Sequence, residues 1–151
     1  MGIFDFFKKP IIIEDDFFGK LRFMKMKDPG KSYFEGKGLF EPTGKEIGYI
    51  IEGKESGPEQ KQKEFYKWIQ ENYLELTTKF TPLVEDEFGN WKDNFKIIDF
   101  DREFILVGVT IPIQDNTPFE WDMSFDTIHD ENHQVTVDFI GLEPHGVLID
   151  G

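Results

Sequence analysis

Apolar and polar residues alternate along two segments in the C-terminal half of the chain, and this period of two predicts β-strands. The alternation runs over residues 119–126 and again over residues 135–140, so that each strand has one apolar and one polar face. Residues 102–113 are apolar at nearly every position, which predicts a central strand covered on both faces. We expect residues 95–100 to form a shorter strand or an extended lead-in to the central strand, and residues 142–149 to form an edge strand or a strap.

The N-terminal half contains further segments of strand length, separated by turns rich in glycine and proline. We predict strands over residues 17–26, 33–40 and 45–53, and because the turns between them are short, we expect an antiparallel meander. Gly36 and Gly38 fall on one face of the second of these strands. Glycines at such positions are typical of a β-bulge or of a place where another group packs close to the backbone.

Between these two groups of strands the apolar spacing changes to the three and four residues of a helix. The apolar stripe comprises Phe65, Trp68, Ile69, Tyr73, Leu76, Phe80, Leu83 and Val84. Ser56 and Glu59 lie where a capping pair would start the helix. Because Pro82 has no amide hydrogen, we expect the helix, over residues 58–84, to kink or end near Thr81.

This order of elements predicts a single α+β domain over residues 1–151. A strand meander, one long helix and further antiparallel strands would form a mostly antiparallel sheet, with the helix packed on one face. Residues 1–14 are expected to form an N-terminal arm or short helix, in which residues 3–9 make an amphipathic turn. Residues 95–149 are expected to hold the C-terminal strands.

Composition and charge narrow the classes of function. The chain has 17 Lys and Arg against 30 Asp and Glu, for a formal net charge of −13, and a charge of this sign argues against a nucleic-acid partner. No apolar run approaches the length of about 18 residues that spans a membrane. The absence of cysteine excludes disulfides and thiolate chemistry. The N-terminus lacks the features of an export signal, so we expect a cytoplasmic protein.

The two alternating C-terminal strands are expected to pair as a hairpin, with a loop of about five residues over 129–133. In the register that this loop implies, Asp122 faces Asp138 on the polar side of the sheet. By the same register, Asp126 faces Gln134. Two carboxylates directly opposite one another destabilise a sheet unless a cation, a proton or a basic partner lies between them.

We therefore identify a candidate partner-binding surface on this polar face, made of Glu120, Asp122, Asp126 and Asp138. Trp91, in a polar loop after the helix, is a candidate anchor, because tryptophan is favoured in binding hot spots. Two alternatives stay open for the acidic face. It is either a solvated surface without a partner, or a place where one carboxyl with a raised pKa acts as a general acid.

The predicted hairpin loop also carries the best metal-ligand candidates, His129, Asp130 and His133. Imidazole and carboxylate groups suit zinc or manganese. The alternative is an ordinary polar hairpin tip, because these residue types are common in turns. The sequence contains no complete catalytic set and no phosphate-binding loop, so we predict no cofactor and no enzymatic activity.

Two stretches carry a resemblance to a known group of proteins. They are Asp15-Asp-Phe-Phe-Gly19-Lys-Leu21, before the meander, and Gln62-Lys-Glu-Phe-Tyr-Lys-Trp-Ile-Gln-Glu-Asn72, in the predicted helix. Over residues 15–140 the chain resembles small bacterial domains of unknown function, some of which are encoded beside polymorphic toxins and are regarded as immunity proteins. The resemblance implies a cytoplasmic binding protein and carries over no catalytic residue.

The function expected from these observations is that of a non-enzymatic, acidic binding protein that neutralises a basic protein partner, as a monomer or a weak homodimer. The first alternative is a metal-dependent hydrolase that uses the loop from His129 to His133. The second alternative is a structural or regulatory module that self-associates through the sheet edge at residues 142–149.

Overall fold

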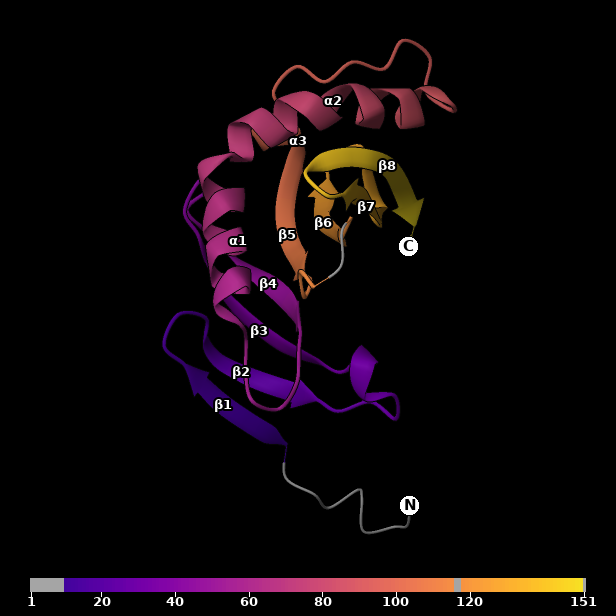
Figure 1. Ribbon diagram of the computed structural model, residues 1–151. Coiled ribbons are helices and arrows are strands. Elements are labelled where there is room, and N and C mark those ends of the chain that lie inside the picture. Colours follow the sequence, from indigo (N-terminus) through magenta and orange to yellow (C-terminus); the bar gives the residue numbers. More distant parts are fainter. Residues whose placement is uncertain (1–9, 116–117, 151) are drawn as a thin grey trace.

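The computed structural model describes residues 10–115 and 118–150, which fold into one eight-stranded sheet with helices on one of its faces (Figure 1). Neighbours in the sequence are neighbours in the sheet. The strands are β1 (Ile11–Asp15), β2 (Gly19–Met24), β3 (Tyr33–Phe40), β4 (Lys45–Glu52), β5 (Phe104–Ile111), β6 (Glu120–Thr127), β7 (Asp130–Ile140) and β8 (Glu143–Asp150). The mostly antiparallel sheet confirms the predicted mixture of helix and sheet, although strands make up more of the chain than expected.

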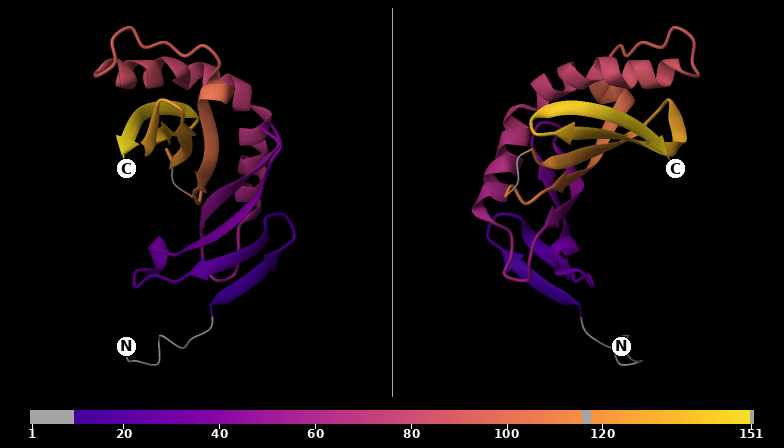
Figure 2. Two further views of the ribbon diagram at one scale, coloured as in Figure 1. Left: turned by 180° about the vertical axis from the view of Figure 1, so that it is seen from behind. Right: turned by 45° about the vertical axis from the view of Figure 1, so that its right-hand side comes forward.

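Each neighbouring pair of strands is antiparallel except β4 and β5, which run parallel. A parallel pair needs a long crossover connection, and the helices between β4 and β5 supply it. The crossover lies on one face of the curled sheet, and its helices follow the curvature of the sheet (Figure 2). We call the opposite face, on which neither long helix lies, the open face.

Two helices, α1 (Gln60–Glu71) and α2 (Tyr73–Gly89), replace the single helix that we expected over residues 58–84. They meet at Asn72, whose side-chain amide donates a hydrogen bond to the carbonyl oxygen of Trp68 at 2.8 Å. An asparagine that bonds the preceding turn in this way competes with the regular helical pattern and ends α1. The helical segment starts at Glu59, where the backbone amide donates to Gln62 Oε1 at 2.9 Å, and not at Ser56.

The helix does not end at Pro82, the second of the two alternatives expected there, because α2 continues through this residue to Gly89. A proline leaves the carbonyl four residues earlier without its helical donor. That residue, Thr78, is exposed, and Pro82 is exposed as well, so water can reach the freed carbonyl. Burial of Val84 and Phe88 beyond the proline stabilises the continued helix.

Most predicted strands are confirmed, and the differences have local causes. The meander is formed by β2, β3 and β4, and the segment expected over residues 142–149 forms the edge strand β8 from Glu143 onward. Residues 11–14, expected in an arm or helix, belong instead to β1, and the expectation for residues 3–9 lies outside the described residues. Residues 95–99 are irregular and lead into the short helix α3 (Phe100–Glu103), so of the two alternatives for residues 95–100 the strand is wrong.

The core lies between the helices and one face of the sheet and is rich in phenylalanine. Its fully buried rings include Phe34, Phe40, Phe80, Phe88, Phe104, Phe125 and Phe139. Of the two alternatives for the glycines of β3, a bulge or close packing, close packing is confirmed. A Cβ atom on Gly36 would lie 2.5 Å from a methyl carbon of Leu21, and one on Gly38 would lie 2.7 Å from the hydroxyl oxygen of Tyr49. The Tyr49 hydroxyl also donates to the carbonyl oxygen of Phe18 at 2.6 Å.

Candidate functional site: the open face of the sheet

The strand registers place one row of side chains across the open face, from the first strand to the last. Residues that pair directly across neighbouring strands share a face of the sheet. The row consists of Ile12, Arg22, Glu35, Ile50, Thr110, Asp122, Asp138 and Gly146. The row is basic and apolar near β1, whereas it is acidic where it crosses β6 and β7.

The predicted pairing of Asp122 with Asp138 is confirmed, because these two residues are direct partners between β6 and β7. The pairing predicted for Asp126 and Gln134 is wrong. A bulge between Phe125 and Thr127 shifts the register near the turn, so these two residues are not direct partners. The bulge leaves the acidic pair in the regular part of the ladder, where the two side chains lie side by side.

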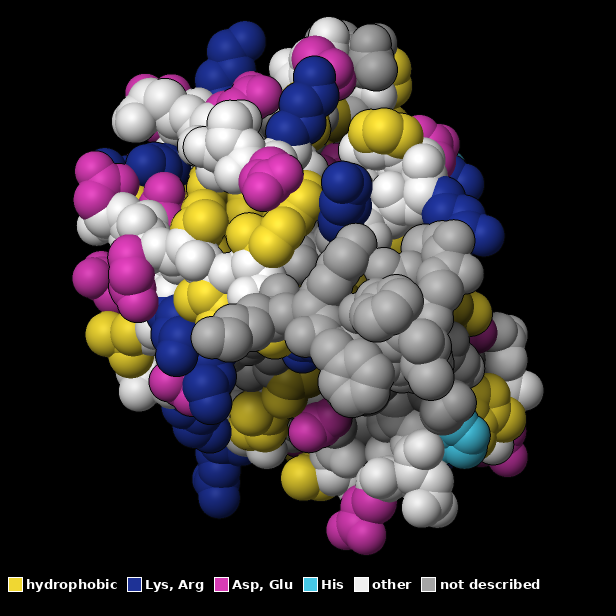
Figure 3. Space-filling model, turned by 90° about the horizontal axis from the view of Figure 1, so that it is seen from below, with side chains coloured by type: hydrophobic (Ala, Val, Ile, Leu, Met, Phe, Trp, Pro, Cys, Tyr) yellow, Lys and Arg dark blue, Asp and Glu magenta, His cyan; other side chains and the backbone are white. Residues whose placement is uncertain are grey.

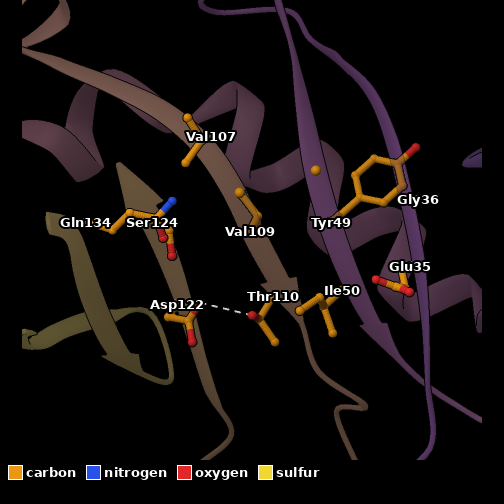
Figure 4. Close-up of a pocket in the computed structure, with 12 residues that line it drawn as sticks. Glu35, Gly36, Tyr49, Ile50, Val107, Val109, Thr110, Asp122, Ser124 and Gln134 are labelled. Atoms are coloured by element: carbon orange, nitrogen blue, oxygen red, sulfur yellow. Dashed lines mark hydrogen bonds between the residues drawn. The ribbon is translucent and has the colours of Figure 1, made fainter. Parts of the chain in front are cut away.

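Asp122 is the most enclosed carboxylate of this face. Thr110 donates a hydrogen bond from its hydroxyl to Asp122 Oδ1 at 2.9 Å, drawn as a dashed line in Figure 4. Burial raises the pKa of Asp122, and the nearby charge of Asp138 raises it further, although the Thr110 hydrogen bond acts in the opposite direction. The ionised form of Asp122 is therefore less stable here than it is in water.

Two shallow recesses flank Asp122. The first, of about 290 Å³, has a floor without side chains where Gly48 of β4 pairs with Gly108 of β5, and Glu35 and Ser124 lie along its sides (Figure 4). The second, of about 440 Å³, is bounded by Glu52, Thr110, Glu120, Asp122, Asp138 and His145, among other residues. Both recesses open to solvent and carry carboxylates, so they suit a positively charged group.

Charge is distributed unevenly between the two halves of the sheet. No lysine or arginine follows Arg102 in the sequence, whereas ten aspartate and glutamate residues do, so β5 to β8 contain no lysine or arginine. In the other half, Arg22 pairs across strands with Glu35, and Lys37 Nζ lies 3.7 Å from Glu46. The view from below, toward the end that carries β1 and β2, shows basic and acidic side chains interspersed there (Figure 3).

The structure brings the four predicted acidic residues to the open face but separates Trp91 from them. Glu120, Asp122 and Asp126 alternate along β6, and Asp138 lies beside them on β7. Trp91 follows α2, on the helical side of the sheet, where its half-exposed ring packs 5.2 Å from that of Phe88. Trp91 therefore does not extend the acidic surface.

The metal-ligand candidates are not brought together. The predicted five-residue loop is wrong, because β6 and β7 are joined by a two-residue turn and β7 already begins at Asp130. His129 Nε2 lies 2.7 Å from Glu103 Oε1, whereas His133 Nδ1 lies 2.7 Å from Asp130 Oδ2. Each ring is held by a different carboxylate, and residues 10–115 and 118–149 contain no group of three or more ligating side chains placed to hold a metal ion.

Glu103 is an important residue that the sequence pattern did not reveal. The residue is only 8% exposed, and its Oε2 accepts hydrogen bonds from the backbone amides of Ile98 at 2.8 Å and Asp99 at 2.6 Å. Burial acts to raise the pKa of Glu103, but these amides and His129 outweigh it, so the pKa lies below its usual value. Glu103 thereby joins the loop after α2 to the β6–β7 turn.

Comparison with known proteins adds no family to these observations. A scan against protein-family models found no match, and searches of curated proteins and of solved structures found none either. Among the described residues, no helix has both the length and the apolar character needed to cross a membrane. Function is therefore inferred from the open face itself.

Proposed function

We propose that this chain is a non-enzymatic binding protein whose acidic open face docks a basic protein partner. The observation that carries the proposal is the direct opposition of Asp122 and Asp138 in a half of the sheet whose four strands contain no lysine or arginine. Like charges held in this way cost stability, and a cationic side chain from a partner would relieve that cost. The excess negative charge would also accelerate encounter with a basic protein.

An immunity-type role, in which the partner is a toxin and the complex forms in the cytoplasm, is the specific form of this proposal. The resemblance of residues 15–140 to domains encoded beside toxins supports it. A gene for a large secreted toxin next to the gene for this chain would strengthen it. An adjacent toxin that does not bind the purified chain would contradict the immunity role and leave the broader binding role standing.

The binding role is tested by capture and then by substitution. The immobilised chain should capture a basic protein from a lysate of its host at low salt, and the affinity should fall as salt increases. The double variant Asp122→Asn/Asp138→Asn should then bind that partner at least about tenfold more weakly.

The matched control is the double variant Glu64→Gln/Glu71→Gln, which changes the net charge equally on exposed positions of α1. Its affinity should stay within about twofold of the unmodified chain. Capture of acidic proteins only, or equal weakening by both double variants, would contradict docking on the open face.

A further inference from the structure

We infer that two copies of this chain associate through β1, so that their sheets join edge to edge into one continuous sheet. This association does not depend on the proposed binding function, because it leaves the open face of each copy accessible. The inference rests on the exposed edge of β1, on its self-complementary sequence and on the distribution of charge along the sheet.

The outer side of β1 has no neighbouring strand among the described residues. β1 is the first strand of the sheet, and the views in Figures 1 and 2 place it at the outer rim of the molecule. Its apolar residues reach solvent on both faces, since Ile11 is exposed on one face and Ile12, 49% exposed, on the other. An edge strand with apolar side chains and unpaired backbone groups is a template for another strand.

The sequence of β1 is complementary to itself. When two copies pair antiparallel about Ile12, the two Ile12 side chains face each other and Ile11 of each copy faces Ile13 of the other. Glu14 then lies opposite Pro10, so no carboxylate of β1 faces another. Pairs of β-branched residues directly across strands stabilise a sheet, and a two-fold axis through Ile12 gives a closed dimer.

The distribution of charge favours β1 over the opposite edge, β8. Residues 10–57, which contain β1 to β4, have eight basic and nine acidic residues and are nearly balanced. The region after Arg102 has ten Asp and Glu residues but no Lys or Arg, and it contains β5 to β8. Pairing through β8 would place two strongly negative half-sheets side by side, whereas pairing through β1 keeps them at opposite ends of the joined sheet.

Sedimentation equilibrium of the full chain from about 10 μM to 1 mM tests this inference. A single short strand pair buries less surface than the roughly 1,200 Å² of a stable interface, so we expect a dissociation constant on the order of 100 μM. Amide hydrogens of β1 should become more protected from exchange as the protein concentration increases.

Two matched variants identify the edge. Ile12→Glu places the new carboxylates of the two copies opposite each other across the two-fold axis, so we expect association to be at least about tenfold weaker. Within one copy the new carboxylate faces Arg22, so we expect the fold to stay intact. Leu148→Glu makes the same change on β8, at a residue of similar exposure, 52%, and should leave association unchanged. If Ile12→Glu does not fold, the exchange measurement on the unmodified chain decides.

Three results would overturn the inference. The first is a strict monomer up to 1 mM. The second is a dimer that Leu148→Glu weakens and Ile12→Glu does not. The third is a monomer in which the amides of β1 are protected at every concentration, which would mean that another segment of the same chain pairs with this edge.

Discussion

Asp122 and Asp138 face each other directly across β6 and β7, on a half of the sheet that contains no lysine or arginine. Removing one of the two charges should therefore stabilise the isolated protein. We expect Asp138→Asn to raise the free energy of unfolding by about 0.5 kcal/mol at pH 7, as measured by urea denaturation. Glu131→Gln, at an exposed residue of the same strand, should change it by less than about 0.3 kcal/mol. A destabilised Asp138→Asn protein would show that the pair is not strained.

The raised pKa of Asp122 predicts how stability depends on pH at this position. Because the folded chain holds the proton more tightly than the unfolded chain does, ionised Asp122 destabilises the fold above its folded pKa. This penalty diminishes as the pH falls through the folded pKa and vanishes below the unfolded value of about 3.9. Asp122→Asn should thus exceed the unmodified protein in stability at pH 7, and the difference should shrink toward pH 4 in thermal melts. A difference that grows on acidification would contradict the assignment.

Glu103 should make a large contribution to stability through the groups that it joins. Glu103→Ala leaves the amides of Ile98 and Asp99 without their acceptor, so we expect a loss of about 2 kcal/mol in the free energy of unfolding. Hydrogen exchange should become faster in residues 95–99. Glu64→Ala, at an exposed position of α1, serves as the control and should change stability by less than about 0.5 kcal/mol.

The lowered pKa of Glu103 has the opposite consequence for pH. Its ionised form stabilises the fold at pH values above the unfolded pKa of about 4.3, and this contribution is lost as the pH falls through the lower, folded pKa. The stability difference between the unmodified protein and Glu103→Ala should therefore narrow in acid. A difference that is constant down to pH 2 would mean that the charge of Glu103 does not matter.

The contact between Gly38 and Tyr49 predicts a coupling between two substitutions. Gly38→Ala places a methyl group 2.7 Å from the Tyr49 hydroxyl and should cost about 1–3 kcal/mol of stability. Tyr49→Phe removes that oxygen, so the double variant should be more stable than the sum of the single changes predicts. Gly146→Ala enters open space and should change stability by less than about 0.5 kcal/mol. If the stability effects of Gly38→Ala and Tyr49→Phe simply add in the double variant, the new methyl group does not clash with the Tyr49 hydroxyl.

Local patterns predicted most of the sheet, because alternation and short turns determine strand pairing over short distances. The facing of Asp122 and Asp138 followed from alternation in two strands joined by a tight turn. The five-residue loop was wrong because the pattern carried no sign that His129 ends the turn and that β7 begins at Asp130. The shorter turn does not change the pairing of β6 with β7 from Glu120 to Phe125. The bulge beside Phe125 compensates for the difference between the expected and the observed length of the turn.

The remaining errors concern interactions between distant residues. The helix tolerates Pro82 because this residue is exposed. Glu103 links two segments because it contacts His129, 26 residues away. Neither the exposure nor the contact can be recognised in a local sequence pattern. β1 was missed because its three consecutive isoleucines do not alternate with polar residues. Trp91 was placed with the acidic surface on residue type alone, and its position depends on how α2 packs.

The parallel junction between β4 and β5 has a consequence for how the chain folds. Each other pair of neighbouring strands is joined by a comparatively short connection, so the four-stranded units on either side of the junction form from nearby contacts. Joining them requires closure of a connection of about 50 residues, and such long-range contacts form slowly. We expect the pairing of β4 with β5, at Gly48 and Gly108, to form last, after the aromatic residues of α1 and α2 have packed against the sheet.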